Sequence, residues 1–403
     1  MTISSSAAPA ARPTGLWAAL LCRVAQRARH GEITVVLPDG RSRRIEGERE
    51  GPSAVVQVCS PRLLWRLWSG GDMGFARAYI DGDCDTPDLE ALLHWALANE
   101  GELAPALETG PWVRLAALMH RLRPNTRAGS RRNIHRHYDL GNRFYGAWLD
   151  GTMTYSAAWF GDRPEASLED AQRAKFERIA AMADLQPGHR ILEIGCGWGG
   201  FALWAARERG CHVTAITVSP AQHAFARARV AEAGLQDAVD VRLVDYRDVT
   251  GSFDRIVSIE MMEAVGERFW PGYAATIRDC LKPGGKAVLQ VITIDDAHFA
   301  AYRSRADFIQ TYIFPGGMLP SPERVGAAMT GAGLQAAGET GFGADYARTL
   351  RRWKEAFEAA WPEIRDLGFD ERFRRMWRYY LDYCAVGFDI ARIDVRLFAF
   401  ERP

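Results

Sequence analysis

The 403-residue chain lacks an excess of charge of either sign, since lysine plus arginine and aspartate plus glutamate both number 50. This balance does not favour a nucleic-acid partner, which requires a basic surface. Long hydrophobic runs are also missing. The apolar segment Leu16–Leu21 is too short for a signal peptide and has no cleavage pattern, and no stretch is long enough to cross a bilayer. We therefore expect a cytoplasmic protein.

Cysteine is sparse, scattered and odd in number, with residues at 22, 59, 84, 196, 211, 280 and 384. No two of them form a C-x-x-C pair, so neither a disulfide framework nor a zinc site is indicated, and we expect no metal. This use of cysteine suits a reducing compartment. Tryptophan, by contrast, is abundant with 13 residues. It fills protein cores, but it also suits apolar grooves and membrane interfaces.

The most informative segment is Ile191–Phe201, which reads ILEIGCGWGGF. A short apolar run containing Glu193 is followed by glycines, among them Gly195, Gly197 and Gly199, and then by an apolar helix start. This pattern predicts a strand, a tight turn and a helix. Glycine suits such a turn because a ligand approaches the backbone closely and because positive φ is penalised for other residues.

The glycine spacing also satisfies the fingerprint for NAD or FAD, which calls for an acidic residue about 20 positions on, at the end of the second strand. That predicted strand, HVTAITVS, ends at Thr217 and Ser219 without a carboxylate. Glu193 instead stands where Rossmann-like methyltransferases that use S-adenosylmethionine (SAM) place an acid. A carboxylate suits the cationic methionine end of SAM better than a pyrophosphate. The stretch therefore favours SAM.

Alternating strands and helices are predicted on both sides of this turn. We expect helix 170–184, strand 190–194, helix 199–209, strand 212–217, helix 220–233, strands 239–244 and 254–259, helix 267–281 and strand 285–293. Such alternation is typical of a doubly wound parallel sheet. Helices rich in Phe, Tyr and Arg follow at 297–312, and we interpret an insertion at about 295–330 as a lid over the substrate.

The N-terminal part predicts a disordered tail at 1–14, a small α+β domain at 15–100 and a linker at 101–133 that is basic at its end. A helix at 16–29 has one apolar face, and packing within its own domain is favoured over membrane docking. The basic segment suits a solvated connection, with contact to anionic lipid head groups as the alternative. Period-2 strands are expected near Glu32–Leu37, Arg41–Ile45 and Ala54–Val58, followed by a helix at Pro61–Trp68.

Several motifs together resemble the cyclopropane-fatty-acyl-phospholipid synthases and the related mycolic acid methyltransferases. In chain order they are NIHRHYDLGNRFYGAWLDGTMTYSAAWF, LEIGCGWGGFALWAA, AITVSPAQ, EMMEAVG, LKPGGKAVLQVITI, YIFPGG, GFGADYARTLRRW and YLDYCAVGF. The N-terminal GGDMGFARAYIDGD resembles the small lipid-facing domain of the bacterial phospholipid enzymes. The resemblance implies an α/β, Rossmann-like class I SAM-dependent methyltransferase domain with a helical lid at 134–403, preceded by that small α+β domain.

The resemblance also implies a set of SAM-binding residues in addition to Glu193 and the glycines. Tyr155 and Ser156 are expected to close over the methionine. The segment with Thr217, Ser219 and Gln222 matches the family's ribose contacts, and Asp245 and Tyr246 lie where the adenine binds. At the carboxyl ends of parallel strands these residues would form one site.

In this family an isolated alkene takes the methyl group from the sulfonium, and a base then removes a proton so that a ring closes. The resemblance implies that the base is a bicarbonate ion held by Cys196, Glu263, Gln290, Ile292 and Tyr346. Two positions depart from the family pattern: a histidine is replaced by Gln290, and the histidine after the glutamate by Ala264. A glutamine amide can still donate a hydrogen bond to an anion.

Cys384 matches a cysteine that the family is often assigned as active, although alkene methylation needs no thiolate, so a packing role is an equal alternative. The residues expected to be catalytic are Glu263, Tyr346, Gln290 and Cys384. The predicted reaction is methylation of the double bond of acyl chains in membrane phospholipid, with cyclopropane fatty acid as the lead product. A methylene- or methyl-branched product and a catalytically weak lipid-binding relative are the alternatives. We expect a peripheral protein on the inner face of the membrane, and a homodimer is left open.

Overall fold

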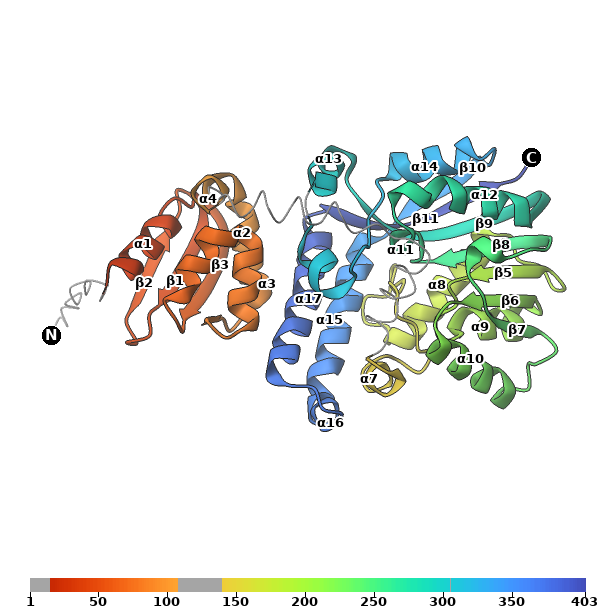
Figure 1. The fold of residues 1–403 in the computed structure, drawn as a ribbon, viewed down its shortest axis with the longest axis horizontal. Helices are drawn as coiled ribbons and strands as arrows, with labels where there is room; N and C mark the ends of the chain where they lie inside the picture. Colours follow the sequence, from red (N-terminus) through yellow and green to blue (C-terminus); the bar gives the residue numbers. More distant parts are fainter. Residues whose placement is uncertain (1–14, 108–139, 305) are drawn as a thin grey trace. The chain divides into compact units, whose positions relative to one another are not determined.

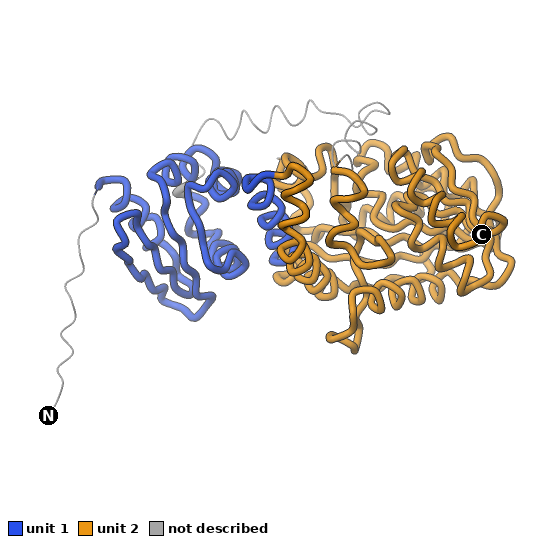
Figure 2. Tube along the Cα trace, turned by 90° about the horizontal axis from the view of Figure 1, so that it is seen from below, with its two compact units in different colours: residues 1–119, 370–386 blue, residues 120–369, 387–403 orange. Residues whose placement is uncertain are grey.

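The computed structural model describes residues 15–107, 140–304 and 306–403 (Figure 1). The chain divides into two compact units, one formed by 1–119 with 370–386 and the other by 120–369 with 387–403 (Figure 2). The second unit differs from the expected methyltransferase domain at 134–403: it is assigned from 120 on, and residues 370–386 cluster with the N-terminal part. The expected disordered tail and most of the expected linker lie outside the described residues.

Unit 1 contains a four-stranded sheet with strand order β2-β1-β3-β4. Its elements are α1 (Leu16–Ala25), β1 (His30–Val36), β2 (Ser42–Glu46), β3 (Arg49–Val58), α2 (Arg62–Ile80), β4 (Cys84–Asp85), α3 (Leu89–Ala98) and α4 (Glu100–Leu107). The three predicted strands are confirmed, although β3 starts earlier than expected. Helix α2 continues well beyond the predicted Trp68, across a kink at Gly71, and α4 occupies the beginning of the expected linker.

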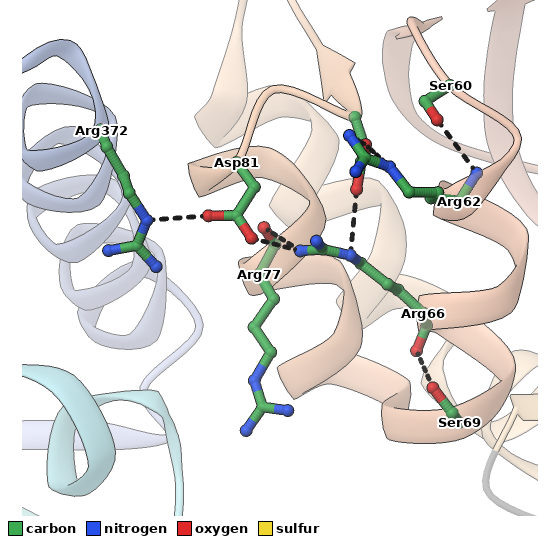
Figure 3. Close-up of polar contacts among 8 residues, drawn as sticks. Ser60, Arg62, Arg66, Ser69, Arg77, Asp81 and Arg372 are labelled. Carbon is green, nitrogen blue, oxygen red and sulfur yellow. Dashed lines mark hydrogen bonds and ion pairs between the residues drawn. The ribbon is translucent and has the colours of Figure 1, made fainter.

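Arginines join the first part of helix α17 (Glu371–Asp389) to the rest of unit 1. Arg372 donates to Asp81, which also accepts from Arg66 (Figure 3). Arg375 donates to the carbonyl oxygen of Tyr79 at 2.6 Å, and its guanidinium lies 4.2 Å from the centre of the Tyr79 ring. Because these partners are almost 300 residues away in sequence, this packing cannot be read from local patterns.

Unit 2 is built on a seven-stranded sheet with the order β10-β11-β9-β8-β5-β6-β7 (Figure 1). The strands are β5 (Arg190–Ile194), β6 (His212–Thr217), β7 (Val239–Leu243), β8 (Phe253–Ile259), β9 (Leu281–Ile294), β10 (Gln335–Gly341) and β11 (Ile393–Glu401). Strands β7, β6, β5, β8 and β9 are parallel, whereas β11 runs antiparallel to both of its neighbours. The predicted parallel sheet is confirmed.

The helices of unit 2 connect these strands. They are α7 (Asn142–Gly146), α8 (Leu168–Met182), α9 (Gly200–Arg209), α10 (Pro220–Glu232), α11 (Met262–Val265), α12 (Trp270–Cys280), α13 (Asp296–Ser304), α14 (Pro322–Gly331), α15 (Gly343–Ala359), α16 (Trp361–Asp366) and the last turn of α17, with short η1 (Tyr246–Asp248), η2 (Glu267–Phe269) and η3 (Ile309–Ile313). Right-handed crossovers place α9 and α10 on one face of the sheet and α12 on the other.

The sheet reverses its winding direction between β5 and β8, because the chain proceeds from β5 to β6 and β7 and then returns to β8. Ligands of doubly wound sheets bind at such a switch point, beyond the carboxyl ends of the strands. The insertion expected as a lid at about 295–330 is only partly separate from this core. Helix α14 belongs to the core, since Val325 and Met329 are fully buried against β9 and α12.

Candidate active site

A cavity lies at the switch point, at the carboxyl ends of β5, β6 and β8. Nine of the predicted SAM-binding residues line it: Tyr155, Ser156, Glu193, Gly195, Gly197, Thr217, Gln222, Asp245 and Tyr246. The two others, Gly199 and Ser219, stand at the starts of helices α9 and α10 beside the cavity. Gly199 precedes α9 with φ 84°, and the Ser219 hydroxyl caps α10 by accepting from the Gln222 N–H. The structure therefore brings the predicted set together around one space.

The turn after β5 needs glycine for two physical reasons. Gly195 has φ 84°, a left-handed conformation that side chains disfavour. A Cβ at this position would also lie 3.0 Å from Cγ of Met261. Gly197 likewise has a positive φ of 54°. The turn can thus hold its shape and expose backbone to a ligand only without side chains at these positions.

Glu193 is buried at the end of β5, and burial raises the pKa of its carboxyl from 4.5 to about 8, opposed by the charge of Lys175. Among the described residues, no group donates to its buried Oε2 atom. A buried acidic oxygen without a donor, in the wall of a cavity, fits the cationic methionine end of SAM. Glu193 would accept a hydrogen bond from the cationic methionine end of SAM and stabilise its positive charge.

Polar groups also fit the remaining parts of SAM. Thr217 donates to Oε1 of Gln222 at 3.0 Å, and this contact fixes the buried Gln222 amide in the cavity wall. Such an amide would suit ribose hydroxyls in the absence of an acid on β6. Asp245 is tied to Arg247 by a paired contact, with Nη2 to Oδ2 at 2.6 Å. The neighbouring Tyr246 offers an aromatic ring to the adenine.

Lys175 was not singled out from the sequence, because it lies within an ordinary amphipathic helix pattern. In α8 it is fully buried and donates to Oγ of Ser156 at 2.7 Å. Burial lowers the pKa of its amine to about 7, opposed by the charges of Glu260, Asp150 and Glu193. Lys175 therefore positions Ser156 and places a cation near two acidic groups of the site.

Glu260 is the main functional candidate that sequence reasoning missed. It follows β8 directly, lines the cavity and has φ 51°, which is rare outside glycine. Its Oε1 atom accepts from the backbone N–H of Ala157 at 2.8 Å and from Nε2 of Gln290 at 2.7 Å. Its Oε2 atom accepts from the Tyr346 hydroxyl at 2.8 Å. The sequence did contain an indication of Glu260, because an acidic residue directly after a predicted strand beside the switch point is a candidate for a functional site.

Three of the groups expected to hold bicarbonate donate to protein carboxylates. Gln290 and Tyr346 donate to Glu260, whereas the backbone N–H of Ile292 donates to Oε1 of Glu263 at 2.5 Å. The N–H of Cys196 donates to the carbonyl oxygen of Ile216 at 2.9 Å. Of the five residues expected to hold bicarbonate, Cys196 alone is among those that line the cavity. Glu260, which does not belong to that set, also lines it.

Glu263 follows Glu260 by three residues and lies in the short helix α11. Burial and the nearby charge of Glu260 raise the pKa of its carboxyl to about 8, so Glu263 is mostly protonated at neutral pH. The insertion after β9 reaches this residue, because the N–H of Met318 donates to the Glu263 carbonyl oxygen at 2.8 Å. The two acids therefore differ in their surroundings: Glu260 accepts from three donors, and Glu263 is kept largely neutral.

Cys384 is half-buried and belongs to the part of α17 in unit 1. It is not among the residues that line the cavity, and its predicted catalytic role stays a prediction.

Aromatic side chains pack behind Tyr155, which lines the cavity. The ring centre of Tyr155 lies 5.1 Å from that of the fully buried Trp353, and Tyr346 stacks on Phe388 at 4.6 Å. Trp148 completes the group with an edge contact to Trp353. Rings packed in this way exclude water, and a ring in the cavity wall, such as that of Tyr155, can attract positive charge.

The switch-point cavity, the glycine turn and the buried acid on β5 define a class I SAM-dependent methyltransferase. Comparison with known proteins agrees and refines this class. The family model described as mycolic acid cyclopropane synthetase matches residues 125–398, and the chain belongs to this family. The resemblance seen in the sequence, the fold class and the assignment as a methyltransferase are thereby confirmed.

Two relatives illustrate the range of the family. The chain is 37% identical to the tuberculostearic acid methyltransferase UfaA1 of Mycobacterium tuberculosis, over 98% of this chain and 97% of the relative. It is 36% identical to the cyclopropane-fatty-acyl-phospholipid synthase of Escherichia coli K12, over 87% of this chain and 88% of the relative.

Solved structures of the family have the same fold as unit 2. The cyclopropane synthase MmaA2 from Mycobacterium tuberculosis superposes with a TM-score of 0.64 at 30% identity, covering 70% of this chain and 99% of that one. The mycolic acid cyclopropane synthase CmaA1, complexed with SAH and CTAB, gives a TM-score of 0.63 at 30% identity, covering 70% of this chain and all of that one.

Proposed function

We propose that this protein transfers a methyl group from SAM to the double bond of an unsaturated acyl chain in membrane phospholipid, with cyclopropane fatty acid as its main product. The observation that carries the proposal is a cavity whose SAM-compatible wall also contains the aromatic ring of Tyr155 and the carboxyl group of Glu260. The names of the relatives, one of which is a cyclopropane-fatty-acyl-phospholipid synthase, support the substrate class.

The residues around the cavity account for the demands of this reaction. SAM supplies the methyl group, and Glu193 and the glycine turn would hold its methionine end. The acyl chain becomes a carbocation after it takes the methyl group, so water must be kept out. Tyr155 in the cavity wall, packed on the buried Trp353, would help to exclude water and would lower the cost of the positive charge. A base must then accept one proton.

A second candidate is methylation without ring closure, which gives a methylene- or methyl-branched chain. Two observations favour it. The tuberculostearic acid methyltransferase matches nearly the whole chain. The family's histidine is replaced by Gln290, which contacts the acid beside the cavity. The two products differ in which proton is lost, because loss from the new methyl closes the ring and loss from a chain carbon leaves an alkene.

Contact with the bilayer surface is part of the proposal. Within unit 1, helices α1 and α2 expose large apolar side chains: Leu16 is 87% exposed, Leu20 49%, Trp65 65% and Trp68 59%. Tryptophan and leucine on short helices are suited to the lipid interface. The basic segment at 121–132 lies outside the described residues. No helix in the described ranges is long and apolar enough to span a membrane. Location on the inner face and homodimer formation remain proposals.

The test is labelling of lipids in cells that express the full chain and contain monounsaturated phospholipid. With methyl-labelled methionine, we expect label in the acyl chains, and cyclopropane protons by NMR. Ozonolysis detects a branched alkene, which has the same mass as the ring. Branched alkene alone would replace the lead product by the second candidate. Absence of label would refute the methylation of acyl chains, and calorimetric SAM binding without label would indicate a catalytically weak lipid-binding relative.

A further inference from the structure

Glu260 has a placement that SAM binding alone does not explain. Within the described residues, three donors converge on its carboxylate: the Ala157 N–H, the Gln290 amide and the Tyr346 hydroxyl. Gln290 and Tyr346 are the two side-chain donors that the family resemblance assigned to a bicarbonate ion. Two side chains predicted to hold an external carboxylate-like anion therefore hold a carboxylate of the chain itself.

We propose that Glu260 is the general base of the reaction, built into the chain in place of a bound bicarbonate ion. This inference rests on the proposed function, because it identifies the proton acceptor for the same acyl-chain methylation.

The geometry leaves the carboxylate able to accept a proton. A carboxylate has about four lone-pair sites on its two oxygens. The donors from described residues use two sites on Oε1 and one on Oε2, so Oε2 keeps a lone-pair site that no described donor uses, and Glu260 is a residue of the cavity wall. Burial raises the pKa of Glu260, opposed by the Ala157 N–H, the charge of Lys175, Tyr346 and Gln290. A base is most effective when its pKa approaches the working pH.

The step balances without an external reactant. The S–CH₃ bond breaks, its electron pair stays on sulfur, and the alkene π pair forms the new C–C bond. The neighbouring carbon then carries the positive charge. Oε2 of Glu260 takes a proton from the new methyl, and that C–H pair closes the ring. If the proton comes from a chain carbon, the pair forms an alkene instead. Glu260 ends as a neutral acid and returns its proton to solvent after product release.

The backbone conformation of Glu260 also supports a functional role for its side chain. Glu260 adopts φ 51°, a conformation that glycine would adopt without strain. Strained conformations of non-glycine residues cluster at functional sites. The partner also fits, because the amide of Gln290 never carries a charge. A protonated histidine at that position would stabilise the ionised acid and make it a weaker base.

The experiment measures label transfer from methyl-labelled SAM to vesicles of monounsaturated phospholipid, in buffer freed of carbon dioxide and with bicarbonate restored. We expect the parent protein to have the same rate within about twofold in both buffers. Glu260→Gln removes the base and keeps the shape, so the rate should fall by about 100-fold or more. Glu263→Gln resembles the neutral acid already present and should lose far less. The exposed Glu208→Gln serves as the matched surface control.

Glu260→Gly adds a chemical-rescue test. It relieves the backbone strain and leaves the three donors facing a space the size of a carboxylate. We expect this variant to be almost inactive without bicarbonate and to regain at least about tenfold in rate with added bicarbonate or formate, the usual range of a positioned base being about 100- to 10,000-fold. SAM affinity by calorimetry and the circular dichroism spectrum should stay near those of the parent for both Glu260 variants, which separates loss of the base from loss of fold.

Two results would overturn the inference and leave the proposed function intact: a parent rate that depends on bicarbonate, or a folded Glu260→Gln variant that retains the parent rate. No labelled acyl chain from the parent protein in either buffer would instead refute the proposed function. A Glu260→Gly variant that binds SAM but is not rescued by either anion would count against the built-in base.

Discussion

Binding of SAM should release a proton from Glu193. The carboxyl of Glu193 is buried, its pKa is raised to about 8, and its Oε2 atom has no donor among the residues the structure describes. The free protein therefore holds this group largely as the neutral acid at neutral pH. The cationic methionine end of SAM favours the ionised form, so that binding and loss of the proton are linked.

The size of the effect follows from the pKa. With a pKa of about 8, about nine tenths of the Glu193 side chains are protonated at pH 7, so about 0.9 proton leaves per SAM bound. Affinity should increase about tenfold for each pH unit between about 6 and 7.5 and level off above about 8.5. Lys175 acts in the same direction, because its pKa is lowered to about 7 and a second cation favours its neutral form.

Calorimetric titration in two buffers with different ionisation enthalpies measures the released protons directly. Glu193→Gln should reduce proton release by about 0.9 at pH 7 and weaken SAM binding, and the contribution of Lys175 should remain. An affinity of the parent protein that does not change from pH 6 to 8, with no proton release, would refute the assignment of Glu193 to the cationic end of SAM.

Three further predictions concern other links between sequence and function. Gly195→Val should weaken SAM binding by at least about tenfold. The change forces φ 84° on a branched residue, at a cost of about 1–2 kcal/mol, and crowds Met261. A folded variant whose SAM affinity by calorimetry equals that of the parent would contradict this prediction. The unfolding free energy of the SAM-free protein should fall as pH rises from about 5 to 7. Glu193 and Glu263, both with pKa about 8, keep their protons in the folded protein, whereas unfolded glutamates release them. Thermal melts across this range measure whether stability falls as expected. Replacing exposed Trp65 with Ser should reduce sedimentation with anionic vesicles at low and at high salt. Binding by charge alone would instead weaken as salt is added, because charges are screened within about 10 Å at 0.1 M salt.

The sequence predicted most of the sheet that positions the site. Strands 190–194 and 212–217 have the predicted limits, because buried parallel strands are short apolar runs bounded by clear turn residues. The predictions were less accurate where tertiary contacts decide. Residues 370–386 cluster with unit 1 through Arg375 and its partners, and α14 belongs to the core rather than to a separate lid. Local patterns contain no information about such distant partners.

The acids after β8 show why the site was only partly predictable. Glu260 and Glu263 are three residues apart in EMMEAVG, and the family resemblance directed attention to the second. Their roles separate in space because the chain takes a left-handed turn at Glu260 and directs its carboxylate to Gln290 and Tyr346. Seen in the sequence alone, Gln290 indicates a weakened anion site. Next to Glu260, the Gln290 amide is an uncharged donor that suits an internal base. The departure from the family pattern at 290 therefore fits the presence of the acid at 260.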